Sequence, residues 1–240
     1  MYFCRNKSIM RKLAVVTGGS KGIGKAIAGK FIRAGYEVAV CGRDLGALEE
    51  LRASLAPATL HIFSADVSRK EETEAFGDFI LGLNLPVSAL VNNAGVFIPG
   101  KLLEEDESHL RLQLDTNLMS AFYLTRKLIH RIKDAKNAHI FNICSIASLS
   151  AYPYSGSYSI SKFALLGFSK SIREELKETG VRVTSVMPGA TLTDSWAGTE
   201  LPASRFIRAE DVAEAVWAAY QLSPSAVMEE IVIRPQLGDL

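Results

Sequence analysis

The sequence predicts an α/β fold in which a doubly wound, seven-stranded parallel sheet carries helices on both faces. Short apolar segments rich in β-branched residues alternate with longer amphipathic segments along the chain. This alternation is typical of right-handed βαβ units. The short segments are apolar at nearly every position, as parallel strands buried on both faces are. A chain of 240 residues with 48% hydrophobic content is long enough for one substantial α/β core.

The elements are expected in strict alternation. Strands are predicted at 13–17, 37–41, 59–64, 87–92, 139–144, 181–187 and 229–235. Helices are predicted at 22–34, 44–55, 69–83, 116–134, 155–179 and 209–222. The least regular segments, 94–106 and 188–208, follow strands and are expected to border the ligand crevice, the second as a mobile lid. Without a linker or an internal repeat, we expect one domain over 11–240, preceded by a mobile extension at 1–10.

Composition excludes several classes of function. The formal net charge of +1 argues against nucleic acid and acidic membranes as partners, and no apolar run approaches about 18 residues. The N-terminus lacks the apolar core of a signal peptide, and Met10 is an alternative start. Three scattered cysteines, Cys4, Cys41 and Cys144, indicate a reducing cytoplasm, and the four histidines show no metal-ligand spacing. We therefore expect a cytoplasmic protein without a metal site.

A glycine-rich turn, "TGGSKGIG" (17–24), joins the first predicted strand to the first helix. Its glycines, Gly18, Gly22 and Gly24, permit a tight turn and a close backbone approach to a pyrophosphate. The helix N-terminus then presents free N–H groups and its positive dipole end to that anion. In this position the turn predicts a Rossmann-type dinucleotide site, whereas a glycine triplet elsewhere is weak support.

The end of the second strand, "VAVCGRD", bears on which dinucleotide is bound. NAD binding usually needs a carboxylate there for the ribose 2′-hydroxyl. Gly42 occupies that position, Arg43 follows it, and Lys21 lies in the glycine turn. Two cations suit a 2′-phosphate, so NADP(H) is favoured over NAD(H). Asp44 is the competing acid, but its position suits the N-cap of the next helix.

Seven motifs in register resemble the short-chain dehydrogenase/reductase family, in its compact single-domain branch, from about Leu13 onward. They are "TGGSKGIG" (17–24), "DV" (66–67), "NNAG" (92–95), Asn117 in "DTNLMSAF", Ser145 in "NICS", "YSISK" (158–162) and "PGATLT" (188–193). The C-terminal sequence and "TDSW" are most similar to bacterial sepiapterin-reductase-like members. The glycine and catalytic motifs fit 3-oxoacyl-[acyl-carrier-protein] reductases equally well.

The resemblance implies a set of cofactor-binding residues. These are Gly18, Ser20, Lys21, Gly22, Ile23, Gly24, Arg43, Asp66, Val67, Asn93, Ala94, Gly95, Tyr158, Lys162, Pro188, Gly189, Thr191 and Thr193. Asp66 and Val67 are expected to contact the adenine, and Asn93 is expected beside the adenosine ribose. The segment from Pro188 to Thr193 is expected to cover the nicotinamide and pyrophosphate.

The resemblance also implies a catalytic tetrad of Asn117, Ser145, Tyr158 and Lys162. Tyr158 and Lys162 lie four positions apart, so a helix places them on one face. Free tyrosine is a weak acid at neutral pH, and a nearby ammonium stabilises its phenolate. Tyr158 is then the general acid in reduction, and Ser145 binds the developing oxyanion. Asn117 is expected to hold a water that links Lys162 to solvent.

Several residues offer competing interpretations. Tyr123 and Lys127 share the same spacing but lie in the middle of a predicted helix, so we expect them to pack or face solvent. Ser148 competes with Ser145, and the resemblance favours Ser145. Cys144 is interpreted as inert core, because it ends a buried strand.

The predicted function is an NADP(H)-dependent oxidoreductase acting on a ketone or secondary alcohol of a small molecule, including sepiapterin-like pterins. One alternative is a 3-oxoacyl-thioester reductase, and another is a non-catalytic NADP(H) sensor. Residues proposed to line the substrate pocket with Ser145 are Phe97, Tyr152, Tyr154 and Trp196. For the aromatic residues the alternative is packing within the lid. The resemblance also implies a homodimer or homotetramer formed through helices 116–134 and 155–179.

Overall fold

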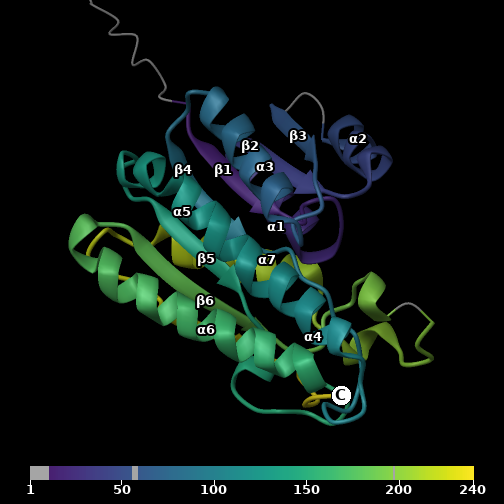
Figure 1. Cartoon of the computed structure of the whole chain (residues 1–240). Coiled ribbons are helices and arrows are strands. Elements are labelled where there is room, and N and C mark those ends of the chain that lie inside the picture. The colour runs from purple at the N-terminus through teal and green to yellow at the C-terminus, as the bar shows by residue number, and fades with distance from the viewer. Residues whose placement is uncertain (1–10, 56–58, 197) are drawn as a thin grey trace, which may run out of the picture.

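A computed structural model describes residues 11–55, 59–196 and 198–240, so the extension expected at 1–10 lies outside the described residues. Its strands are β1 (Leu13–Thr17), β2 (Glu37–Gly42), β3 (Leu60–Ser64), β4 (Val87–Asn92), β5 (His139–Ile143), β6 (Arg182–Pro188) and β7 (Glu230–Ile233). They form one sheet in the order β3-β2-β1-β4-β5-β6-β7, and every neighbouring pair is parallel (Figure 1). The seven-stranded parallel sheet predicted from the sequence is therefore confirmed.

Helices cover both faces of this sheet. They are α1 (Gly22–Arg33), α2 (Leu45–Ser54), α3 (Lys70–Gly82), α4 (Glu107–Leu114), α5 (Ser120–Lys133), α6 (Gly156–Leu176) and α7 (Ala209–Gln221). Along β1, Ala14 and Val16 join a core with α1, α2 and α7, whereas Leu13 and Val15 join a core with α3 and α5. Alternate side chains of one strand thus enter opposite cores, which explains why the strands are apolar throughout. None of the described helices combines the length and apolarity that crossing a bilayer requires.

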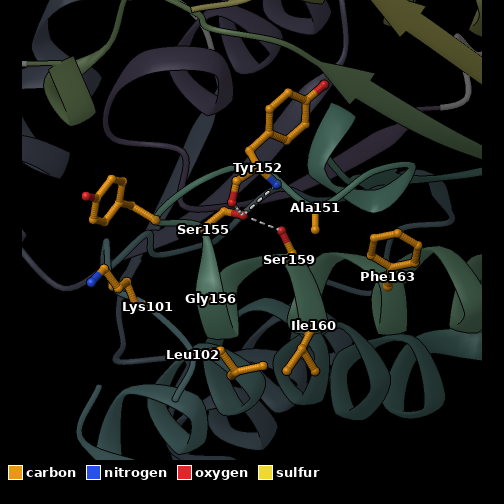
Figure 2. A pocket seen from close by; sticks show the side chains of 11 residues that line it. Lys101, Leu102, Ala151, Tyr152, Ser155, Gly156, Ser159, Ile160 and Phe163 are labelled. Carbon is orange, nitrogen blue, oxygen red and sulfur yellow. Dashed lines mark hydrogen bonds between the residues drawn. The ribbon is translucent and has the colours of Figure 1, made fainter. Parts of the chain in front are cut away.

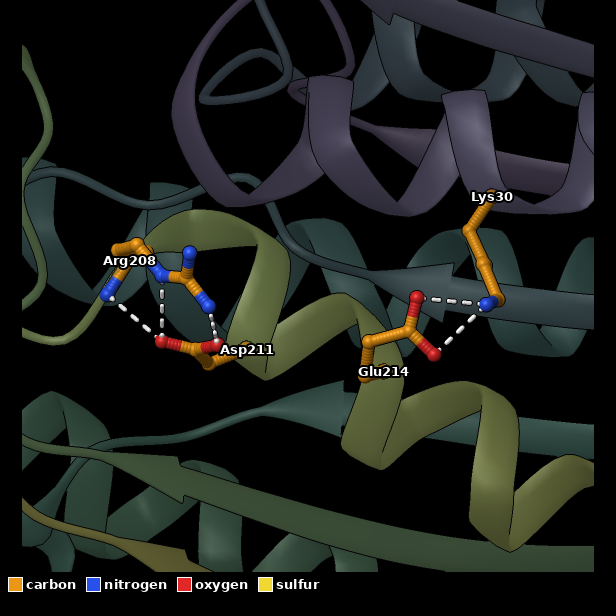
Figure 3. A network of polar contacts seen from close by, with 4 residues as sticks. All are labelled: Lys30, Arg208, Asp211 and Glu214. Carbon is orange, nitrogen blue, oxygen red and sulfur yellow. Dashed lines mark hydrogen bonds and ion pairs between the residues drawn. The ribbon is translucent and has the colours of Figure 1, made fainter.

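An aromatic cluster joins α1 to α7 on one face. Phe31 is fully buried, and its ring meets the rings of Tyr36, Trp217 and Tyr220 edge-on, at 5.3 Å in each case. Between the same two helices, Lys30 Nζ lies 2.6 Å from both carboxylate oxygens of Glu214 (Figure 3). Such a surface pair contributes about 1 kcal/mol or less, so the buried rings dominate the packing of α7.

The helix that carries Asn117 is longer than predicted. The prediction of a helix at 116–134 is wrong at its start, because α4 begins at Glu107, capped by Asp106 Oδ1, which accepts from Ser108 N at 2.8 Å. A π-helical turn, Asp115–Met119, joins α4 to α5. A π turn contains an extra residue, so the apolar faces of α4 and α5 do not follow one helical period. Because of this shift, a helix predicted from one continuous hydrophobic period does not include α4.

The topology positions a ligand crevice at the carboxyl ends of the strands. The chain moves outward from β1 to β3 and then returns to β4, on the other side of β1. In open α/β sheets, ligands bind where the strand order reverses in this way. The glycine turn after β1 and the loop after β4 therefore face the same crevice.

Candidate active site

The glycine turn is packed so tightly that side chains would collide with backbone. A methyl group at Gly24 would lie 2.2 Å from Gly18 O, and one at Gly18 would lie 3.0 Å from Ala94 Cα. Gly18 and Gly22 also adopt positive φ values of 62° and 50°. Glycine is the residue that tolerates both conditions. The turn therefore brings bare backbone to the N-terminus of α1, as a pyrophosphate site requires.

The loop after β4 supports this turn through Thr17 and Asn93. Thr17 Oγ1 accepts hydrogen bonds from the backbone N–H groups of Asn93 and Ala94, at 3.0 and 2.9 Å. Asn93 Nδ2 donates to the carbonyl oxygens of Thr17 and Gly18 at 2.9 and 3.0 Å. The amide of Asn93 thus holds the glycine turn in place. The family resemblance places Asn93 beside the adenosine ribose and does not indicate this supporting role.

The end of β2 presents a cation and a hydroxyl, and the acid there is already engaged. Asp44 Oδ1 accepts from Ala47 N at 3.0 Å, so the competing acid caps α2 as expected. Arg43 is exposed and forms no ion pair within the described ranges. The Ser20 hydroxyl lies close to Gly42, 3.2 Å from a methyl group placed there. A free guanidinium and a hydroxyl beside a residue without a side chain suit an anionic group.

The second predicted cation already has a partner. Lys21 Nζ lies 3.1 Å from Asp194 Oδ2, and both side chains are exposed. The hydrogen bond and charge of Asp194 raise the pKa of Lys21 above its ordinary value. This pair links the glycine turn to the segment after β6. Thr193 reinforces the link, because a methyl group at Gly22 would lie 2.9 Å from Thr193 Cγ2.

The remaining predicted cofactor residues make different contacts. Thr191 is buried and donates to Gly189 O at 3.0 Å, while Gly189 N donates to Ile233 O at 2.8 Å beyond Pro188. Asp66 Oδ1 accepts from the N–H and hydroxyl of Ser68, which shapes the turn before α3. The side chains of Val67 and Ile23 pack toward the core.

Lys162 and Tyr158 lie together on α6. Lys162 is 4% exposed, and its ammonium donates to Ile143 O at 2.9 Å. The same Nζ lies 5.7 Å from the centroid of the Tyr158 ring. No carboxylate in the described part of the chain lies within ion-pair distance of it. The ammonium therefore keeps its charge available for the phenol, as a proton-transfer pair requires.

Ser145 follows β5 and caps the short 3-10 helix that comes next. Its Oγ accepts from Ala147 N at 3.1 Å, and none of the described hydrogen bonds uses its hydroxyl proton. Ser148 is 1% exposed, and its Oγ accepts from Ser145 N at 3.3 Å. The competing serine thus helps to hold the backbone of Ser145, while the proton of Ser145 is available to an incoming oxygen.

Asn117 locks the loop after β4 onto α6. Its Oδ1 accepts from Val96 N at 2.7 Å, and its Nδ2 donates to Val96 O at 3.0 Å and to Ser161 Oγ at 2.8 Å. Both amide protons are thereby used, so the side chain is mainly a structural link. Gly95 passes close by, since a methyl group there would lie 3.4 Å from Lys162 Nζ.

Sequence reasoning missed a second amide on the same helix. Gln113 is fully buried, and its Oε1 accepts from Ile98 N at 3.1 Å. Gln113 and Asn117 are four positions apart, the spacing that puts two side chains on one helix face. This spacing is a signal in the sequence that could have revealed Gln113, but none of the seven family motifs includes that residue.

The second tyrosine–lysine pair lies far from this chemistry, between α5 and α3. Lys127 Nζ forms an ion pair with Asp78 Oδ1 at 2.7 Å. Lys70 Nζ lies over the Tyr123 ring, 5.3 Å from its centroid. These are packing contacts at a helix surface, as expected from the sequence.

The four aromatic residues proposed for the substrate pocket separate into three places. Phe97 packs edge-on against Tyr158, with 4.9 Å between ring centroids. Trp196 packs against Phe206 within the segment after β6, with 5.0 Å between ring centroids. Tyr152 and Tyr154 line a pocket of about 460 Å³ that Ser145 and Tyr158 do not line.

Tyr152 is held by the C-terminal segment. In Figure 2 its ring extends away from Leu102 and Ile160 at the other side of that pocket. Its hydroxyl donates to Asp239 Oδ2 at 3.0 Å. Of the four aromatic residues, Phe97 is thus the one in contact with Tyr158.

Cys144 should be unreactive in the folded protein. Burial raises the pKa of its thiol to about 11, and that of Cys41 to about 12. Both groups remain neutral thiols at pH 7, and thiolates are the reactive species. Iodoacetamide treatment followed by peptide mass analysis should leave both residues unlabelled before unfolding and labelled after it. Rapid native labelling of Cys144 would contradict the core assignment.

A glycine cradle at the sheet's reversal point, beside a helix carrying a tyrosine and a buried lysine, defines the class of dinucleotide-binding oxidoreductases. Comparison with known proteins agrees: the family model described as short chain dehydrogenase matches residues 12–202. The chain belongs to the short-chain dehydrogenase family, and it is an oxidoreductase.

Individual relatives support this assignment. The sepiapterin reductase of Chlorobaculum tepidum is 32% identical over 242 residues, covering 96% of this chain and 99% of the relative. An alcohol dehydrogenase from the archaeon Thermococcus sibiricus, complexed with 5-hydroxy-NADP, superposes with a TM-score of 0.86 at 27% identity, covering 94% and 97% of the two chains. A metagenomic short-chain oxidoreductase in complex with NADP gives 0.82 at 29%, covering 95% and 98%. The family and fold expected from the sequence are confirmed.

Proposed function

We propose that this chain is an NADP(H)-dependent oxidoreductase that interconverts a ketone and a secondary alcohol of a small molecule. The observation that carries the proposal is the ammonium of Lys162, buried beside Tyr158 without a carboxylate partner among the residues that the structure describes. Burying a charge is costly, and a fold retains such a group where its charge is used. A sensor that only binds a dinucleotide has no need for a proton donor such as Tyr158.

The proposed roles follow from the hydrogen bonds. Tyr158 donates its hydroxyl proton to the carbonyl oxygen, and Lys162 stabilises the phenolate that remains. Ser145 donates a hydrogen bond from its hydroxyl to the same oxygen and so stabilises the charge that develops there. Asn117 holds Val96 and Ser161 in place, and thereby supports both walls of the site. When bound, the nicotinamide supplies or accepts the hydride.

The cofactor preference rests on the end of β2. Gly18, Gly22 and Gly24 form the backbone cradle, and the exposed Arg43 is the residue proposed to bind the 2′-phosphate. Two solved relatives are complexes with NADP or 5-hydroxy-NADP, which supports the same choice.

Arg43→Ala should weaken NADPH binding by about 10- to 100-fold and leave NADH binding within about twofold. The reason is that a charge-assisted hydrogen bond to the 2′-phosphate is lost, and NADH has no such group. Fluorescence titration with each nucleotide measures both dissociation constants. Arg52→Ala, on the exposed face of α2, is the matched control and should change neither. Equal losses for both nucleotides would overturn the assignment.

The substrate class is tested with a panel of carbonyl compounds. The relationship to a sepiapterin reductase at 32% identity makes a pterin with a side-chain ketone the first compound to assay. A 3-oxoacyl thioester tests the alternative reductase, and NADPH and NADH are compared in parallel. If no compound in the panel supports NADPH oxidation while NADPH binds, the sensor alternative gains support.

The assembly and location remain part of the proposal. A homodimer or homotetramer through helices 116–134 and 155–179 is supported by Ile160 and Phe163 on α6, which are 39% and 46% exposed. The cytoplasmic location is proposed from the scattered cysteines of the sequence. Light scattering of the purified protein measures the assembly directly.

A further inference from the structure

The turn that leads into α6 is held in an unusual backbone conformation. Tyr154 has a φ of 58° and Gly156 a φ of 21°. A bulky residue at positive φ is strained, and such strain persists where surrounding contacts hold it. Tyr158 lies in the first turn of α6, two residues after Gly156. The contacts that hold this turn therefore also set the position of Tyr158.

Glu105 makes the contact that closes the start of α6. Its Oε1 accepts from Ser157 N at 3.0 Å and also from the Ser157 hydroxyl. The residue at the usual capping position, Ser155, makes no side-chain cap, because its hydroxyl bonds to the backbone of Tyr152 and to Ser159 (Figure 2). A carboxylate from a loop 52 residues earlier thus satisfies a helix N–H and faces the positive end of α6.

The space around Glu105 indicates a fitted contact. A methyl group at Gly156 would lie 3.0 Å from both carboxylate oxygens, and one at Gly100 would lie 2.9 Å from Oε2. Gly100 N also donates to Tyr154 O at 2.9 Å, directly on the strained residue. The loop and the turn are therefore interlocked by backbone and carboxylate together. The same loop carries Phe97, whose ring packs against Tyr158.

We propose that Glu105 is a positioning residue, an external cap of α6 that fixes Tyr158 relative to Lys162 and Phe97. The proposal rests on the proposed role of Tyr158 as proton donor. None of the hydrogen bonds among the described residues joins Glu105 to Tyr158, so Glu105 acts through Ser157. The loop that borders the substrate and the helix that carries the acid then move as one unit.

Three variants test this role: Glu105→Ala, Glu105→Gln and Glu104→Ala. Glu105→Ala should lower kcat by about 10- to 100-fold with the NADPH dissociation constant within twofold, because small displacements at a reacting group are costly. Glu105→Gln keeps an acceptor oxygen for Ser157 and should restore kcat to within about threefold of the parent. Glu104→Ala is the matched control, since Glu104 is exposed and pairs with Lys101 at the surface.

Amide hydrogen exchange of the peptide covering 154–160 gives a readout that does not depend on catalysis. Exchange there should accelerate in Glu105→Ala and stay at the parental rate in Glu105→Gln. Ser157→Ala, which removes one of the two donors, should have a smaller effect and should add little to Glu105→Ala in the double variant. This series also covers the case in which Glu105→Ala fails to fold.

The outcomes separate the two proposals. Unchanged exchange in Glu105→Ala, or unchanged kcat well below its melting temperature, would overturn the positioning role. A Glu105→Gln variant whose kcat is as low as that of Glu105→Ala would overturn the positioning role as well. If Tyr158→Phe is as active as the parent, the proposed role of Tyr158 as proton donor fails instead, and the exchange measurement still decides whether Glu105 caps α6.

Discussion

Replacing Tyr158 with phenylalanine should lower kcat for carbonyl reduction by about a thousandfold and leave NADPH binding nearly unchanged. The substitution removes one oxygen atom and keeps the ring that packs against Phe97 at 4.9 Å. The fold should therefore remain intact while the proton donor is lost. Stopped-flow or steady-state NADPH oxidation measures the rate, and fluorescence titration measures binding.

The chain provides an internal control for this experiment. Tyr123→Phe makes the same chemical change at the other tyrosine–lysine pair, whose partners are Lys70 and Asp78 on α3. Its kcat should equal that of the parent. A Tyr158→Phe enzyme that retains more than a tenth of the parental kcat would show that another group supplies the proton.

Replacing Gly24 with alanine should strongly impair both cofactor binding and stability. The added methyl group would lie 2.2 Å from Gly18 O and 2.5 Å from Asn93 Nδ2. Relief of the first contact requires a shift of the turn itself, since the obstructing atom is backbone. We expect a loss of NADPH affinity of about 100-fold or more and a cost of about 1–3 kcal/mol in the free energy of unfolding. Titration with NADPH and denaturant unfolding measure the two effects.

Gly82→Ala is the matched substitution, in α3. A methyl group there meets nothing within 4 Å, and the residue is exposed at the last position of that helix. Alanine should therefore stabilise the fold by up to about 1 kcal/mol and leave NADPH binding unchanged. A Gly24→Ala protein with parental affinity and stability would mean that the turn can relax, and that the cradle is less rigid than the structure indicates.

A feature could be predicted from the sequence when the residues that determine it lie close together in the chain. The strands are contiguous apolar segments, and Tyr158 and Lys162 are one helical turn apart, so short windows reveal them. Asp44 as a helix cap is equally local, because it bonds three residues onward to Ala47.

The contacts that were missed join distant parts of the chain. Glu105 meets Ser157, Asn117 meets Ser161, and Tyr152 meets Asp239. No spacing rule connects residues that become neighbours only after the sheet has assembled. Tyr152 was placed in the substrate pocket because it is aromatic and lies near Tyr158 in sequence, which does not reveal where its hydroxyl is bound.

The π turn at Asp115–Met119 lets the two halves of one long helix face different neighbours. Residues of α5 must face the sheet core through Leu124 and Leu128, whereas Gln113 and Asn117 must face the loop after β4. One extra residue in the turn lets the two halves keep different rotational phases. We therefore expect substitutions in α4 to displace the loop after β4 while α5 keeps its register against the sheet.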